Sequence, residues 1–284
     1  MCEHLVSTTS KGCPYTEDLY SLTIKFSHSL SSLLEIINAV AWHIEDTWGF
    51  LLEWDHKGIV SPATLQVYAN TLTNFGSPGK SIIGFLDCTI RQTCCPSINK
   101  SMAYTGYKKY NRMKFQAIVL PNGLIGHLSG PYCAPQNDAG ILAASHLVDT
   151  LAKYAIQQGS QEGDPPSQCY FQVYADSAYS ISPHILSPFV CLGELMPEET
   201  QLNKVMGSVH ISVKHSFGLV LQDWLYHNAF WKQKIYDNAC CYKFILIFNG
   251  RDCQNIILLE SLLVCGTQLV IDACKSLSHG NLGV

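Results

Sequence analysis

Residues 81–90, SIIGFLDCTI, place a charged residue directly after an unbroken apolar run. Ser81 to Leu86 predict a short strand, and the lack of strict alternation indicates burial on both faces. The run ends at Asp87, whose ionised carboxylate needs a partner there because an isolated buried charge is very costly. A metal ion or a set of backbone N–H donors would be such a partner. The alternative is that Asp87 is only the polar residue that ends the strand.

A second acid follows a second predicted strand. The run YFQVYA, Tyr170 to Ala175, ends at Asp176. In an α/β sheet, carboxylates at neighbouring strand ends can converge in a crevice, where they repel each other unless a cation lies between them. Oxygen ligands select Mg²⁺ or Mn²⁺, and a pair of such ions would activate water for phosphodiester hydrolysis. The alternative for Asp176 is a turn residue that caps the next element.

The remaining pattern predicts a helical N-terminal region followed by an α/β sheet with a mixed edge. The turn Pro121-Asn122-Gly123 indicates a hairpin between two strands. Asn137 or Asp138 is expected to cap the helix that follows. The predicted elements are helices over 30–54 and 62–75, strands over 81–90, 114–120 and 124–128, a helix over 139–156, a strand over 170–175 and a helix over 203–221.

The composition argues against a generally basic nucleic-acid-binding protein. The 284 residues carry a net charge of −4, with 47% hydrophobic and 14% charged residues, so a basic binding surface must be local. One candidate is YTGYKKYNRMK, residues 104–114, where tyrosines alternate with cations that would neutralise phosphates. The alternative is a solvated strand edge whose lysines prevent pairing between sheets. The residues proposed to contact nucleic acid are Tyr107, Lys108, Lys109, Arg112 and Lys114.

The cysteines and the chain ends indicate a reducing compartment. There are 13 cysteines, an odd number, and the first residues lack the order of a signal peptide. Mostly free thiols in the nucleus or cytoplasm are therefore expected. The apolar segment Ile256–Val270 is shorter than the roughly 20 residues that a bilayer requires. It predicts a buried helix, and no membrane association is expected.

Five segments, in this order, resemble DDE-superfamily endonucleases of the Harbinger-type transposase family, in particular the fungal members. The likeness covers roughly residues 30 to 253, and the block from YTGYKKY to FQAIVLPNG is its most specific part. The segments are GFLDCTIRQTC at 84–94, YTGYKKYNRMKFQAIVLPNGLIGHLSGPY at 104–132, PQNDAGIL at 135–142, VYADSAY at 173–179 and NKVMGSVHISVKHSFG at 203–218.

The resemblance implies an RNase H-like fold with Asp87 and Asp176 as two acids that bind Mg²⁺ or Mn²⁺. Asp138 matches a further acidic position near that site, with helix capping as the alternative. The substrate implied is DNA, and a homodimer or a separate DNA-binding partner would complete the assembly. The domains expected are a helical region over 1–80, an RNase H-like endonuclease domain over 81–253 and a divergent tail over 254–284.

The chain departs from this family at the third catalytic acid. The family has a glutamate in a V-E-H-x-F-G context, whereas this chain has Lys214 between Val213 and His215, 38 residues after Asp176. An ammonium 4 Å from a unit positive charge costs about 4 kcal/mol at an effective dielectric of 20. His215 points about 100° away on a helix, which disfavours it as a replacement ligand.

Two functions are therefore expected from different classes. The first is a metal-dependent DNA nuclease of transposon origin, impaired by Lys214. The second is a catalytically inactive relative that binds DNA or protein. The helix over 203–221 is expected to bury a stripe of Val205, Val209, Val213 and Phe217, with Lys214 at its border and within reach of the two aspartates.

Overall fold

The structure is a computed structural model that describes residues 19–223 apart from 78, 96–103, 106–109, 134, 162 and 191–193. The side chains of 19, 21, 22, 37, 105, 110, 209 and 212–223 also lie outside the description. The chain forms two compact units. One is Phe50–Gly218, and the second combines Met1–Gly49 with Leu219–Val284. Within the described part, no helix is long and apolar enough to cross a membrane.

The second unit contains the N-terminal helices α2 (Leu19–Phe26) and α3 (Leu30–Trp48). Helix α3 begins at the N-cap Ser29, whose Oγ accepts a hydrogen bond from the Ser32 amide at 3.2 Å. Such a cap satisfies one of the free N–H groups of the first turn. The helix ends at Trp48, before the predicted Trp54, and the chain continues as a 3₁₀ turn, η1 (Gly49–Leu52).

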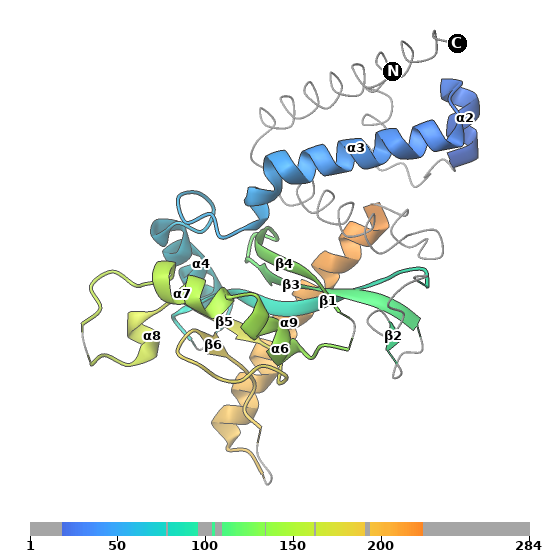
Figure 1. Cartoon of the computed structure of the whole chain (residues 1–284). Coiled ribbons are helices and arrows are strands. Elements are labelled where there is room, and N and C mark those ends of the chain that lie inside the picture. Colours follow the sequence, from blue (N-terminus) through green and yellow to red (C-terminus); the bar gives the residue numbers. More distant parts are fainter. Residues whose placement is uncertain are drawn as a thin grey trace. The chain divides into compact units, whose positions relative to one another are not determined.

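The Phe50–Gly218 unit is built on a mixed sheet (Figure 1). Three antiparallel strands, β1 (Ile82–Gln92), β3 (Tyr110–Val119) and β4 (Ile125–Cys133), form one half, with the two-residue β2 (Tyr104–Thr105) also paired to β3. The short strands β5 (Gln172–Ala175) and β6 (Ile185–Leu186) pair in parallel on the other side of β1. The order β4-β3-β1-β5-β6, flanked by helices, is that of an RNase H-like α/β fold.

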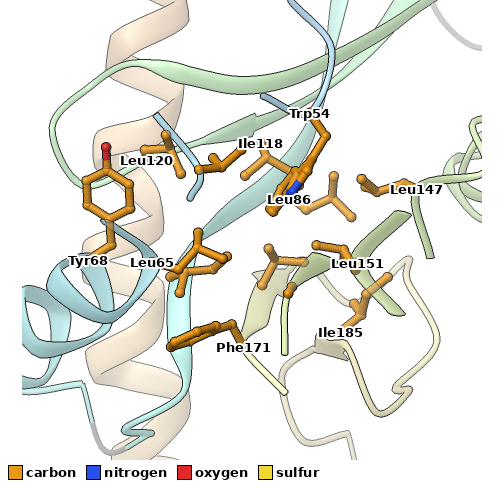
Figure 2. Close-up of a cluster of buried hydrophobic side chains, with 14 of the residues drawn as sticks. Trp54, Leu65, Tyr68, Leu86, Ile118, Leu120, Leu147, Leu151, Phe171 and Ile185 are labelled. Atoms are coloured by element: carbon orange, nitrogen blue, oxygen red, sulfur yellow. The ribbon is translucent and has the colours of Figure 1, made fainter. Parts of the chain in front are cut away.

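One face of this sheet carries the main hydrophobic core (Figure 2). Side chains alternate between the faces of a strand, so Leu86 and the neighbouring Ile118 point to the same side. They meet Leu65 and Tyr68 from α4 (Pro62–Asn74) and Leu147 and Leu151 from α7 (Leu147–Tyr154). These contacts remove large apolar side chains from water, and burial of each contributes about 1.5–3 kcal/mol.

The predicted helix over 139–156 is two helices in the structure. Helix α6 (Asp138–Ala144) ends at Ser145, and α7 begins after His146, which has a positive φ of 51°. A residue in that left-handed conformation interrupts the helical hydrogen-bond pattern. After the short α8 (Pro166–Cys169) and the two parallel strands, the described chain ends with α9 (Pro197–Asp223), which begins earlier than predicted.

Helix α9 lies over the other face of the sheet. Its His210 ring stacks on Phe85 of β1 with ring centroids 6.0 Å apart, and Phe85 alternates with Leu86 of the main core. Phe85, Asp87 and Thr89 therefore belong to the face that α9 covers. Figure 1 shows α9 and the pair α6 and α7 on different sides of the strands.

Candidate active site

Asp87 lies within β1, not at its end as one interpretation expected. The strand continues to Gln92, and Asp87 pairs with Ala117 across the antiparallel ladder. Its side chain is 13% exposed, and its Oδ1 accepts a hydrogen bond from the Cys88 amide at 2.8 Å. This bond holds one carboxylate oxygen against the strand and leaves Oδ2 directed toward α9.

Asp176 comes directly after β5, beside Asp87. Leu86 and Ala175 are partners in the parallel ladder, so Asp87 and Asp176 are the next residues on two strands that lie about 4.8 Å apart. The Asp176 Oδ1 accepts from the Ala178 amide at 3.0 Å, an Asx turn of the kind that aspartate favours. Asp176 thus has the turn role that the sequence left open, directly after the residue that pairs with Leu86.

His210 is the site residue that the sequence analysis missed. Its Nε2 lies 3.9 Å from Asp87 Oδ2, and the imidazole is 10% exposed. Phe85 stacks on the ring, and Tyr174 meets it edge-on with centroids 6.2 Å apart. One signal was present in the sequence: His210 precedes Lys214 by four residues, and residues four apart share a helix face.

The predicted buried stripe of α9 can be compared with the structure at only one of its four residues. Val205 is only partly buried, whereas Met206 is 1% exposed and His210 is 8% exposed. The side chains of Val209, Val213 and Phe217 lie outside the described residues. Among the described side chains of α9, the buried ones are therefore Met206 and His210, four residues apart. The Lys214 backbone belongs to α9, but its side chain also lies outside the described part.

A buried polar cluster ties β1 to the segment after Asp176 on the opposite face of the sheet. The Tyr179 hydroxyl lies 3.2 Å from Cys88 Sγ and accepts from Gln116 Nε2 at 3.3 Å. Ser145 donates to the Gln116 Oε1 at 2.9 Å. Burial raises the pKa of the Cys88 thiol to about 12 and raises the pKa of Tyr179. Cys88 therefore stays a neutral thiol, and its role here is structural, because nucleophilic cysteines react as thiolates.

Lys114 and Asp138 form an ion pair, which changes the expected role of both. Lys114 Nζ lies 2.9 Å from Asp138 Oδ1 and donates to the Gln136 carbonyl at 2.8 Å. The helix cap is Asn137, whose side chain accepts from the Gly140 amide at 2.8 Å. By alternation, Lys114 points to the face opposite Asp87, so the pair holds Asp138 away from the α9 side where Asp87 lies.

Two of the residues predicted to contact nucleic acid are buried in the structure. Lys114 is 9% exposed and Arg112 is 7% exposed, because both lie in the central strand β3. The interpretation of these two cations as exposed phosphate contacts is therefore wrong. Tyr107, Lys108 and Lys109 lie outside the described residues, so their contact with DNA stays a prediction.

The two aspartates fit a divalent cation in the kind of donor they offer. Carboxylate oxygens suit Mg²⁺ and Mn²⁺, and Asp87 and Asp176 directly follow Leu86 and Ala175, which are partners in the parallel ladder. Across the part of the chain that the structure describes, no three His, Cys, Asp or Glu side chains are grouped so as to hold a metal ion. The structure thus provides two suitable acids without a preformed third one.

Comparison with known proteins identifies the family of this chain. Residues 86–246, more than half of the chain, match a family described as DDE superfamily endonuclease. Searches of curated proteins and of solved structures found no significant match. The family match begins within the strand that carries Asp87 and extends past Asp176 and the whole of α9. The chain therefore belongs to the DDE superfamily endonucleases.

Proposed function

We propose that this chain is a Harbinger-type, transposase-derived DNA endonuclease domain that depends on divalent metal and is impaired by Lys214. The observation that supports the proposal is the parallel pairing of Leu86 in β1 with Ala175 in β5, the residues that directly precede Asp87 and Asp176. Two carboxylates in such a position are suited to share a cation.

In this proposal, Asp87 and Asp176 supply the oxygen ligands. Bound divalent cations would neutralise charge on the scissile phosphodiester and activate water. The Cys88 and Ala178 amides each bond one carboxylate oxygen, and this fixes how the two acids face the substrate. Tyr107, Lys108 and Lys109 are proposed to contact the DNA backbone, with the lysines on phosphates and the ring available for stacking.

The course of α9 supports an effect of Lys214 on this centre. Ser77 Oγ donates to Met206 Sδ at 3.6 Å, before β1 begins, and His210 reaches Asp87 within β1. The helix thus runs along β1, and the backbone at 214 lies about 6 Å farther on in the same direction. A glutamate there would add a third oxygen donor. An ammonium there repels a cation and competes for the carboxylates.

A second function is favoured by the same substitution. A chain that has lost the third acid can keep its fold, because the core in Figure 2 does not include the aspartates. The alternative is therefore a catalytically inactive relative that binds DNA or protein. Metal affinity and cleavage separate the two, since only the nuclease requires both.

Calorimetric titration with Mg²⁺ and Mn²⁺ tests the proposal in three proteins. The chain itself should bind these ions weakly and cleave no DNA, whereas Lys214→Glu should bind at least about tenfold more tightly, a gain of 1.4 kcal/mol or more. Lys204→Glu is the matched control because it makes the same charge change on an exposed part of α9, and it should leave affinity unchanged.

Four results would contradict parts of this proposal. Tight two-ion binding by the unsubstituted chain, or DNA cleavage that Asp87→Ala abolishes, would show an intact nuclease. Equal gains from Lys214→Glu and Lys204→Glu would show that only total charge matters. Failure of Lys214→Glu to bind either ion would favour the inactive relative.

A further inference from the structure

The Asp87 carboxylate is covered by the middle of α9. Its side chain is 13% exposed, that of His210 is 10% exposed, and the His210 Nε2 lies 3.9 Å from Asp87 Oδ2. A phosphate group of a nucleic acid is much larger than a water molecule and does not fit beside a carboxylate that is buried to this degree. A ligand of that size reaches Asp87 only if this part of α9 moves.

Two adjacent residues weaken α9 just before His210. A Cβ added to Gly207 would lie in open space, so packing does not require glycine there, and glycine inside a helix is less stable than alanine. The Ser208 Oγ donates to the Val205 carbonyl at 2.7 Å, a bond that weakens and often bends a helix. Sharp bends in helices occur at Gly and Ser pairs, which makes Gly207-Ser208 a hinge.

The part of α9 before this hinge is fastened to the domain. The Asn203 side chain bonds both backbone groups of Phe189, in the loop after β6, at 2.9 Å each. Met206 is 1% exposed, and its Sδ accepts from the Ser77 Oγ at 3.6 Å. A bend at the hinge therefore moves the part of α9 that follows it and leaves the first part in place.

Tyr174 lowers the stability of the closed arrangement beneath His210. Its ring meets the His210 ring edge-on, with centroids 6.2 Å apart. The residue is 2% exposed, and its hydroxyl has no hydrogen-bond partner among the residues that the structure describes. A buried hydroxyl without a partner costs free energy that contact with water recovers. Moving His210 away opens the side of Tyr174 that faces α9, and this favours the open state.

We propose that α9 bends at Gly207-Ser208 and that the part after this hinge opens as a lid over Asp87. In the closed state the carboxylate is sheltered by His210, and in the open state it is accessible. The opening is a property of the chain alone. Only the ligand that it admits, a phosphodiester of DNA, rests on the proposed function.

Carboxylate footprinting of the full chain measures the opening directly. The protein is treated with a carbodiimide and glycine ethyl ester, and labelling of each acid is followed by peptide mass spectrometry. Asp87 should be labelled much more slowly than Asp149, whose side chain is 81% exposed. Gly207→Ala should slow labelling of Asp87 about fivefold, because alanine disfavours the bend. Labelling of Asp149 should not change.

Tyr174→Phe tests the same opening from the sheet side. It removes the unpartnered hydroxyl, so it should stabilise the closed state and slow labelling of Asp87 about fivefold or more. Tyr179→Phe is the matched control, since Tyr179 is also 2% exposed but its hydroxyl accepts from Gln116 Nε2 at 3.3 Å. It should leave labelling of Asp87 unchanged.

Hydrogen exchange separates a hinge from a general gain in helix stability. The amides of residues 208–211 bond to carbonyls on the other side of the hinge, so Gly207→Ala should slow their exchange about fivefold and leave that of residues 201–205 within about twofold. Equal slowing of both groups would overturn the hinge. Labelling of Asp87 as fast as that of Asp149, or unchanged in both Gly207→Ala and Tyr174→Phe, would overturn the lid. These measurements need neither metal nor DNA, so failure of the nuclease proposal would leave their outcome intact.

Discussion

His127 is a buried histidine in the edge strand β4. It is 9% exposed, and its Nδ1 has no hydrogen-bond partner among the residues that the structure describes. Burial lowers the pKa of its imidazole to about 4. The side chain is therefore neutral in the folded protein at pH 7, and protonation of the buried ring is unfavourable.

This shift predicts a loss of stability in mild acid. Between pH 4 and the ordinary histidine value of 6.5, the unfolded chain binds a proton that the folded chain does not, so the free energy of unfolding falls as pH falls. At 1.36 kcal/mol per pH unit, the loss approaches about 3 kcal/mol at pH 4. Urea unfolding across this range should show a shallower pH slope for His127→Leu than for the parent. Parallel curves for the two proteins would contradict the assignment, and Ile125→Leu on the same strand controls for packing.

Single residues show where sequence reasoning about the site succeeds and where it fails. Asp87 and Asp176 were singled out because a charge after an apolar strand is conspicuous, and the structure pairs the residues that precede them, Leu86 and Ala175. Their role as metal ligands stays a prediction. Lys114 was misinterpreted because its partner Asp138 is 24 residues away, and only the fold brings the two together. His210 was missed because its meaning depends on Asp87, which comes from another element.

At the scale of elements, the break between α6 and α7 had no signal in the apolar pattern. The strands β1, β3, β4 and β5 and the helices α3, α4 and α9 were predicted because periodicity and caps report local structure. The two-residue β6 was missed, since it lies in a proline-rich loop and exists only through pairing with β5. His146 lies inside the apolar pattern of the predicted helix, yet adopts a φ of 51°.

That φ predicts a stabilising substitution. A non-glycine residue in the left-handed region is disfavoured by about 1–2 kcal/mol, and glycine relieves this at the cost of extra freedom in the unfolded chain. His146→Gly should therefore raise the free energy of unfolding by about 0.5–1 kcal/mol. The contact of His146 with Asp149 is exposed, at 79% and 81%, and such pairs contribute little.

Denaturant unfolding of His146→Gly and His146→Ala checks this at the element scale. Both variants remove the imidazole, but only glycine relieves the backbone conformation. His146→Ala should be unchanged or slightly less stable. If the free energy of unfolding rose as much in the alanine variant as in the glycine variant, loss of the side chain rather than relief of φ would be the cause.

For the molecule as a whole, the net charge of −4 sets a condition on DNA binding. A uniformly charged surface of that sign repels a polyanion, so any affinity must come from local cations. Burial removes Lys114 and Arg112 from that role, and the pair Lys108 and Lys109 is the part of the predicted strip that can still neutralise phosphates. The net charge of the chain therefore does not decide whether it binds DNA, and the affinity depends on the adjacent Lys108 and Lys109.

The two lysines predict a small contribution to DNA affinity that depends on salt concentration. Each phosphate neutralised on duplex DNA contributes about 0.9 to the slope of log affinity against log salt. Replacing Lys108 and Lys109 by alanine should lower that slope by about 2 and weaken binding most at low salt.

Lys57 and Lys153 are exposed lysines outside the strip, and their double alanine variant has the same net charge. Fluorescence anisotropy with a labelled duplex, from about 50 to 200 mM salt, compares the two. An equal slope in both variants would mean that Lys108 and Lys109 are ordinary edge lysines, which keep strands from pairing between molecules and do not hold DNA.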